Sequence, residues 1–366
     1  MVLFYKRCIS TLFVDKIIRG GTIMSTFTIR FWGTRGSVPA PLVGADVRSK
    51  VRENIIMYRD AIRRKGLDLL TTQQIEEFLD QQPFDAVSTY GGNTSCVEVL
   101  HRDGHRFVFD MGTGVRELGN ALIKEMFERK GLSISFLLSH IHSDHIQGLS
   151  FFSPLYVNKN TGIENKWTFY GGTNWQKTAE VCLAGQMDPP TFPVSWKEIE
   201  KITASIKCID VYDMAHFYLA VMSGLTLRCR KLNHPQETYG WRIEPSEGPV
   251  IAYTTDNEPF DPAIPDPRLL ALAKNADVWI TDCQYTKDQY NGMYSIPHHG
   301  WGHSYPEAVA ATAVQAGVKH VVLFHHDPAS TDSAITSMQY HTQKLVKNYG
   351  GTTTVTAAYE GLSIEI

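Results

Sequence analysis

Short apolar runs, several of them ended by glycine or aspartate, recur along the chain and predict β-strands. They span residues 27–33, 95–100, 106–112, 133–140, 225–232, 248–256, 277–282 and 320–326, with helical patterns at 115–130, 177–186 and 305–317. Paired strands, then strand–helix alternation, then paired strands again indicate an α/β fold in which helices cover sheets. Polar and metal-binding residue types follow the strands at their carboxyl ends, where open α/β sheets place their sites.

Residues 41–88 interrupt this pattern and predict a helical insertion between two strands. The stretch 47–65 looks helical and stops before Gly66, and Thr71 with Gln74 has the spacing of a capping box for a second helix. The first helix is strongly basic, with Arg48, Lys50, Arg52, Arg59, Arg63, Arg64 and Lys65. The insertion is a candidate lid or interaction element, although any single basic residue could simply belong to a solvated charged face.

The first residues of the chain contain small apolar pieces broken by charged residues, which fits a signal peptide poorly. Met24 stands just before the first convincing strand. We interpret residues 1–23 as an upstream start or a disordered extension, with a targeting segment as the alternative, and residues 24–366 as a single domain.

Composition adds little that is specific. The chain is 43% hydrophobic and 20% charged, with a formal net charge of −3, so it lacks the basic character of a typical nucleic-acid-binding domain. Its six cysteines are scattered without a C-x-x-C pair, which favours reduced thiols and a cytoplasmic protein. No apolar run approaches the ~18 residues of a membrane span, so no membrane partner is expected.

The strongest chemical feature is the segment SHIHSDHIQG, which follows an apolar strand. It offers His140, His142, Asp144 and His145 within six residues. On an extended turn His140 and His142 point the same way, and the other two side chains can reach a second point nearby. Imidazole with carboxylate suits zinc, manganese or iron. A histidine-rich loop that binds nothing is the plain alternative.

At this point the sequence resembles the metallo-β-lactamase superfamily, whose fold is an αββα sandwich with a two-metal site at one edge. The resemblance implies further site residues in order along the chain. Asp110 in FVFDMGTG matches the aspartate that braces the ligand loop, and His234 in LNHPQ matches the third histidine. Asp256 in IAYTTDNE matches the bridging carboxylate, and His325 in VVLFHHDP matches the last histidine.

By this resemblance two divalent metal ions are bound, with zinc expected and manganese or iron as alternatives. One takes His140, His142, His234 and Asp256, and the other takes Asp144, His145, His325 and the shared Asp256. His326 competes with His325, but adjacent strand residues face opposite ways, so only one of them can be a ligand. The related ribonuclease pattern favours His325.

Other segments resemble the branch of the superfamily that contains ribonuclease Z and small phosphodiesterases. These are RFWGTRGSVPAP, YGGNTSCVEV, DCQYT and GWGHSYPEAV. In that branch the histidine of a Gly-His-Ser/Thr motif is thought to protonate the leaving oxygen, which assigns this role to His303. A cysteine at the second metal, usual in true zinc lactamases, is missing, because Cys229 lies five residues before His234. His303 could instead be a loop histidine without a catalytic role.

These resemblances predict a metal-dependent phosphodiesterase in which a metal-bridged hydroxide attacks a small phosphodiester, expected to be a cyclic nucleotide. His303 and Asp144 are the predicted catalytic residues, and Arg35, Asn93, Ser304 and His326 are candidate substrate contacts. The chain looks like the cyclic-nucleotide phosphodiesterases of this branch, including those of anti-Pycsar type, and the resemblance implies a homodimer. The alternatives are a tRNA 3′-processing endonuclease of the ribonuclease Z type and a non-catalytic metal-binding sensor.

Overall fold

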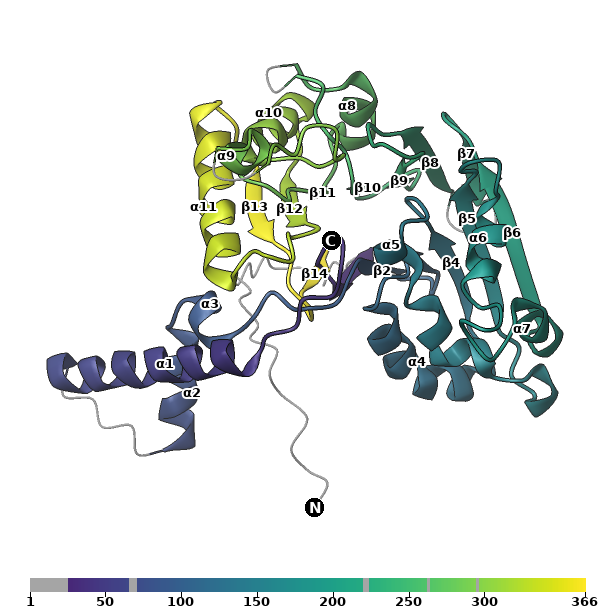
Figure 1. The fold of residues 1–366 in the computed structure, drawn as a ribbon, viewed down its shortest axis with the longest axis horizontal. Helices are drawn as coiled ribbons and strands as arrows, with labels where there is room; N and C mark the ends of the chain where they lie inside the picture. The colour runs from purple at the N-terminus through teal and green to yellow at the C-terminus, as the bar shows by residue number, and fades with distance from the viewer. Residues whose placement is uncertain (1–25, 66–70, 220–223, 262–263, 294–295) are drawn as a thin grey trace, which may run out of the picture. The chain divides into compact units, whose positions relative to one another are not determined.

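The structure is a computed structural model that describes residues 26–65, 71–219, 224–261, 264–293 and 296–366 (Figure 1). By their internal contacts these residues form two compact units. One is Leu42–Thr89, and the other joins Thr26–Pro41 to Tyr90–Ile366. The interpretation of residues 1–23 and the helix stop at Gly66 lie outside the described residues.

The larger unit contains two seven-stranded sheets. The first has the order β14 (Ser363–Glu365), β1 (Phe27–Gly33), β2 (Cys96–His101), β3 (Arg106–Phe109), β4 (Ser133–Leu137), β5 (Lys166–Gly172) and β6 (Ser205–Val211). The second has the order β13 (Thr354–Ala357), β12 (His320–Phe324), β11 (Val278–Asp282), β10 (Ile251–Thr254), β9 (Tyr239–Glu244), β8 (Leu225–Lys231) and β7 (His216–Leu219).

Both sheets are mixed, and each changes from antiparallel to parallel pairing near its middle. In the first, β14, β1, β2 and β3 pair antiparallel, whereas β3, β4, β5 and β6 pair parallel. In the second, β7 to β10 pair antiparallel, whereas β10 to β13 pair parallel. The parallel strands come from strand–helix–strand units, which is the alternation read from the sequence.

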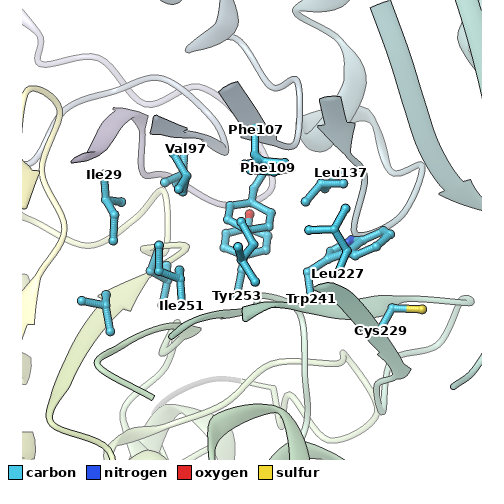
Figure 2. Close-up of a cluster of buried hydrophobic side chains, with 14 of the residues drawn as sticks. Ile29, Val97, Phe107, Phe109, Leu137, Leu227, Cys229, Trp241, Ile251 and Tyr253 are labelled. Atoms are coloured by element: carbon cyan, nitrogen blue, oxygen red, sulfur yellow. The ribbon is translucent and has the colours of Figure 1, made fainter. Parts of the chain in front are cut away.

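The main core lies between the two sheets, where side chains from both inner faces meet (Figure 2). Phe109 from the first sheet stacks on Tyr253 from the second, with ring centroids 4.5 Å apart. Ile29 and Val97 from the first sheet and Trp241 from the second belong to the same core. Strands buried on both faces read as nearly continuous apolar runs, which explains why the sequence pattern located them.

Helices cover the outer faces. A second core packs α4 (Val115–Arg129), α6 (Ala179–Gly185) and α7 (Trp196–Ile202) on the first sheet. Three helices lie with the second sheet: α8 (Pro267–Ala273), α10 (Pro306–Ala316) and α11 (Asp332–Asn348). The unit also contains the short helices α5 (Ser143–Ile146) and α9 (Lys287–Tyr290), and 3-10 turns at Leu149–Phe151, Ser153–Tyr156 and Lys159–Thr161. The predicted α/β fold with two sheets between helices is therefore confirmed.

The smaller unit contains α1 (Gly44–Lys65), α2 (Thr72–Asp80) and α3 (Phe84–Val87). The predicted capping box is present, because the Thr71 side chain and Gln74 bond to each other's backbone N–H groups. Asn54 of α1 donates a hydrogen bond to the carbonyl of Ala86 at 2.8 Å, and the ring of Tyr58 packs against that of Phe78. These contacts make the segment a small helical unit of its own, and a role as a lid stays a prediction.

No helix in the described part of the chain is both long enough and apolar enough to cross a membrane. The region between His145 and His234 contains β5, β6, β7 and β8 with α6 and α7.

Candidate metal centre

The histidine segment follows β4, which pairs parallel with β3 in the first sheet. Its backbone is extended at His142 and turns into the short helix α5, whose first turn carries Asp144 and His145. The other candidate residues also follow strands: Asp110 comes after β3, and His325 comes after β12. Strands from both sheets therefore end at the same place and deliver these side chains to one buried cluster.

Three of the candidate residues have a left-handed backbone. The φ angles are 57° at Asp110, 56° at Asp256 and 58° at His325. This conformation is uncommon for residues with a Cβ, and it occurs at functional sites where the surrounding structure holds it. Asp110 and His325 directly follow buried strands, and Asp256 comes two residues after one. At each of these residues the left-handed turn ends the strand and directs the side chain into the cluster.

The ligand atoms of the candidate residues form two adjoining groups, within each of which they lie within 4.8 Å of one another. The first group contains His140, His142, His234 and Asp256, and the second contains Asp144, His145 and His325. Asp256 lies between them, because its Oδ2 is 3.6 Å from His140 Nε2 while its Oδ1 is 3.4 Å from His145 Nε2 and 3.3 Å from His325 Nε2. One carboxylate thus offers an oxygen to each group.

Contacts behind the cluster orient the imidazole rings. Nδ1 of His145 pairs with Asp110 Oδ2 at 2.8 Å, and Nδ1 of His325 pairs with Gln284 Oε1 at 3.0 Å. Nδ1 of His234 lies 3.2 Å from the carbonyl oxygen of Gly302. A partner at Nδ1 fixes the tautomer and leaves Nε2 for a metal, which is the usual arrangement behind metal-binding histidines.

The protonation states of the first group suit a metal. Burial lowers the pKa of His140, His142 and His234, in the case of His234 to about 4. The imidazoles are therefore neutral at pH 7, as a metal ligand must be. The Nε2 atom of His140 is also buried without any hydrogen-bond partner, which is costly unless something else occupies that position.

The carboxylates are ionised. Burial by itself raises the pKa of Asp144 and Asp256, but the neighbouring His145 and His325 outweigh it and hold both values well below the usual range. The peptide N–H of Ser37 donates a further hydrogen bond to Asp144 Oδ2 at 2.7 Å. In the first group, neutral imidazoles, the ionised Asp256 and the unpaired Nε2 of His140 fit a divalent cation such as zinc, manganese or iron. In the second group burial lowers the pKa of His145, but Asp144, Asp256 and Asp110 outweigh burial and raise it, so a cation bound there would take the place of a proton on this ring.

Asp110 supports the cluster without joining either group. Its carboxylate accepts hydrogen bonds from the backbone and side chain of Ser139 and from Tyr253 Oη, in addition to its contact with His145. Replacing Asp110 with asparagine should reduce metal affinity or activity by about 10–100-fold, the usual cost of losing such a brace. Metal content after dialysis against graded chelator would measure this. Unchanged retention would show that the ligands hold their orientation without the carboxylate.

His303 lies beside the cluster and is 8% exposed. Its ring is stacked 5.1 Å from that of His325, and one of its nitrogens lies within 4.8 Å of the ligand atoms of Asp256 and His325. Nδ1 pairs with Asp282 Oδ2 at 3.1 Å, and the N–H of Ser304 donates to the same oxygen. This leaves His303 Nε2 as the nitrogen that can exchange a proton with a bound molecule.

Three of the candidate substrate contacts are occupied elsewhere. The Arg35 guanidinium donates to the carbonyls of Gly91, Asp327 and Ser330, and the Asn93 amide donates to Glu360. The Nε2 atom of His326 pairs with the carbonyl of Ala358, outside both metal groups. Arg35, Asn93 and His326 therefore have partners within the protein, and a contact of any of them with a substrate stays a prediction.

Several residues that serve the site were missed in the sequence. Gln284 and Ser37 contact His325 and Asp144 directly, and both lie in the family-type segments DCQYT and RGSVP. Glu258, two residues after Asp256, holds the loop that carries His303. Each of them is a polar residue a few positions after a predicted strand, which is a reason to consider it for the site. The sequence does not show which side chain each residue contacts.

Comparison with known proteins agrees with this geometry. The family model of the β-lactamase superfamily domain matches residues 105–326, which is more than half of the chain. The chain therefore belongs to the β-lactamase superfamily, and its two-sheet architecture is the metallo-β-lactamase fold. Its buried histidines and aspartates form groups that could hold metal ions.

Individual relatives are distant. The uncharacterized protein Rv1339 of Mycobacterium tuberculosis is 26% identical over 205 residues, which cover 54% of this chain and 63% of that protein, less than two thirds of its length. Ribonuclease Z of Lactiplantibacillus plantarum is 21% identical over 295 residues, covering 69% of this chain and 87% of the enzyme. The unliganded structure of yeast PDE1 superposes with a TM-score of 0.59 at 13% identity, covering 94% of this chain and all of that one, which shows a shared fold.

Proposed function

We propose that the protein is a metal-dependent phosphodiesterase that hydrolyses a small phosphodiester, with a cyclic nucleotide as the expected substrate and zinc as the expected metal. The observation that carries the proposal is His303, a buried histidine beside the cluster whose Nδ1 is held by Asp282. It also groups with Asp256 and His325, but the seven residues of the two groups above supply both sets of ligands without it. Names among the relatives, ribonuclease Z and yeast PDE1, support phosphodiester chemistry.

Hydrolysis of a phosphodiester requires an activated water molecule, neutralisation of the phosphate charge and a proton for the leaving oxygen. Two divalent cations, when bound, would lower the pKa of a water molecule to about 7 and would neutralise charge on the phosphate oxygens. Hydrolysis forms a bond between phosphorus and a water oxygen and breaks the bond to the leaving alcohol oxygen. That oxygen leaves poorly as an alkoxide, so a positioned acid accelerates the step by about 10²–10⁴-fold. In our proposal His303 Nε2–H gives the proton, and Asp282 stabilises the ring that carries it.

The charge state of His303 fits this role. Burial lowers its pKa, but the Asp282 carboxylate outweighs burial and raises the pKa to about 9. The ring therefore keeps its second proton at neutral pH and loses it only as pH rises through about 9. Asp256 and Asp144 add to the upward shift.

Replacing Asp282 with asparagine should move the alkaline limb of the pH–rate profile to lower pH. Without the carboxylate the pKa of His303 falls, so the proton donor is lost at a lower pH than in the wild type. The profile of kcat/KM against pH, measured with a diester of an alkyl alcohol, would show the shift. An identical alkaline limb in both proteins would mean that it does not report His303.

The substrate proposal is tested with purified, metal-loaded protein and a panel of cyclic mononucleotides, cyclic dinucleotides and pre-tRNA. We expect turnover of at least one cyclic nucleotide. Cleavage of pre-tRNA alone would contradict the proposal and favour the ribonuclease Z type of activity, for which the similarity to the Lactiplantibacillus enzyme is the supporting observation. A steep loss of activity with salt would point the same way, because tRNA binding releases counterions.

We also propose that the protein acts as a homodimer. Sedimentation velocity at micromolar concentration would show a single species of twice the chain mass, and a monomer at that concentration would oppose this part of the proposal.

A further inference from the structure

Glu258 is a buried carboxylate in the loop after β10. It is 8% exposed and accepts three hydrogen bonds. Its Oε1 accepts from Tyr290 Oη at 2.6 Å and from the N–H of Gly300 at 2.8 Å, and its Oε2 accepts from the N–H of Gly302 at 2.9 Å. A buried carboxylate is costly unless hydrogen bonds satisfy it, so these donors and this acceptor stabilise one another.

The main chain of Glu258 also holds the segment that carries His234. Its N–H donates to the carbonyl of Asn233 at 2.8 Å, and its own carbonyl accepts from Asn233 Nδ2 at 2.9 Å. Two residues before it stands Asp256, the carboxylate between the two metal groups. Glu258 therefore connects three pieces of the site: the segments of Asp256 and of His234, and the loop of residues 300–303.

Gly302 links these segments, because its backbone bonds both to Glu258 and to His234. Its N–H donates to Glu258, while its carbonyl oxygen lies 3.2 Å from Nδ1 of His234. The φ angle of Gly302 is 87°, and a Cβ on this residue would lie 1.9 Å from His234 Nδ1. Only glycine fits this position, and the next residue is His303. A displacement of Gly302 would therefore move the His303 ring and remove the partner that fixes the His234 tautomer.

We propose that Glu258 is the positioning residue of the site: by clamping the N–H groups of Gly300 and Gly302, it holds the loop so that His303 faces the scissile ester beside the metal groups. Glu258 does not touch the cluster or the reacting atoms, and it acts through the loop. The proposal rests on the function proposed above and names a determinant of its proton-donation step.

The variant Glu258→Gln tests this role. Its side-chain amide keeps one acceptor oxygen but turns an N–H₂ group toward one of the donors, so the clamp is half broken at nearly constant size. For a diester with an alkyl leaving group we expect kcat to fall by about 10–100-fold, the range for residues that orient a site from behind. For a diester with a p-nitrophenoxide leaving group, which departs without a proton, we expect a change of only a few fold. The assays use saturating metal, so that a weaker hold on His234 does not enter the comparison, and under these conditions KM should stay near the wild-type value.

Three further proteins make the result decisive. His303→Ala should show the same dependence on the leaving group, more strongly. Glu98→Gln is the matched control, because Glu98 is an equally buried glutamate that pairs with Arg106 in the first sheet; it should lower the melting temperature without any dependence on the leaving group. Tyr290→Phe removes one donor and keeps the carboxylate, and it should show a weaker form of the Glu258→Gln effect even if that variant folds poorly.

The outcomes separate the two proposals. If His303→Ala shows the dependence on the leaving group while Glu258→Gln and Tyr290→Phe slow both substrates equally or lose metal, Glu258 is a structural brace and the inference is wrong. If the wild type hydrolyses no phosphodiester, the proposed function fails, and the role of Glu258 fails with it.

Discussion

Replacing Asp256 with asparagine should abolish hydrolysis and empty at least one of the two metal sites. The carboxylate lies between both sets of ligands, with Oδ2 toward His140 and Oδ1 toward His145 and His325. An amide offers one neutral oxygen in place of two charged ones. Because bound cations contribute several kcal/mol to such a reaction, we expect kcat/KM to fall by about 10³-fold or more.

The metal content of the purified Asp256→Asn protein, measured by elemental analysis beside the wild type, checks this prediction directly. Asp266→Asn is a suitable control, because Asp266 is the N-cap of α8 and asparagine caps a helix as well as aspartate. The control should keep its metal and its activity. An Asp256→Asn protein that retained both metals and near-normal turnover would remove the reason for regarding Asp256 as a shared ligand, and would favour a protein that binds metals without using them in catalysis.

Replacing His303 with alanine should lower kcat on an alkyl diester by about 10²–10⁴-fold while both metals remain bound. The ring belongs to neither of the two ligand groups, and its Nδ1 is held by Asp282 rather than by the cluster. Loss of the ring therefore removes a proton donor and leaves the seven candidate ligands in place. With a p-nitrophenoxide leaving group the loss should be much smaller, since that oxygen leaves as a stable anion.

Single-turnover rates with the two leaving groups, together with metal content, measure this effect. His299→Ala serves as the control on the same loop, because His299 is exposed and its ring packs against that of Tyr290. If the His303→Ala protein loses its metal, or is slowed equally on both substrates, His303 has a structural role and the proton donor must be sought elsewhere.

The fold followed largely from local sequence patterns. β12 is a buried, nearly continuous apolar run, whereas β1 alternates buried and half-buried side chains, and the positions of both agreed with the prediction to within one or two residues. The strands β5 and β6 were not predicted, because β5 carries tryptophan, tyrosine and glycines in mixed order and β6 alternates with half-buried polar residues. The place of β5 is decided by parallel pairing with β4, and that of β6 by parallel pairing with β5, which are contacts between distant segments.

By itself the sequence determined the histidine segment, since His140, His142, Asp144 and His145 are encoded within six residues and need only one turn to converge. It also placed polar residues after strands, which pointed to the rest of the cluster. The choice among neighbours belonged to the tertiary structure. His325 enters the cluster and the adjacent His326 does not, because the left-handed turn at His325 and the carbonyl of Ala358 send the two rings to different partners.

The tertiary structure alone decided which polar side chains are left for chemistry. Arg35 and Asn93 have side chains suited to a substrate, but in the structure they donate to carbonyls and to a carboxylate of other segments. Glu258 has no motif, yet the loop that returns to it makes it the anchor of His303. The physical reason is that a ligand motif is local, whereas the hydrogen-bond partner of a buried polar group is set by which strands and loops meet around it.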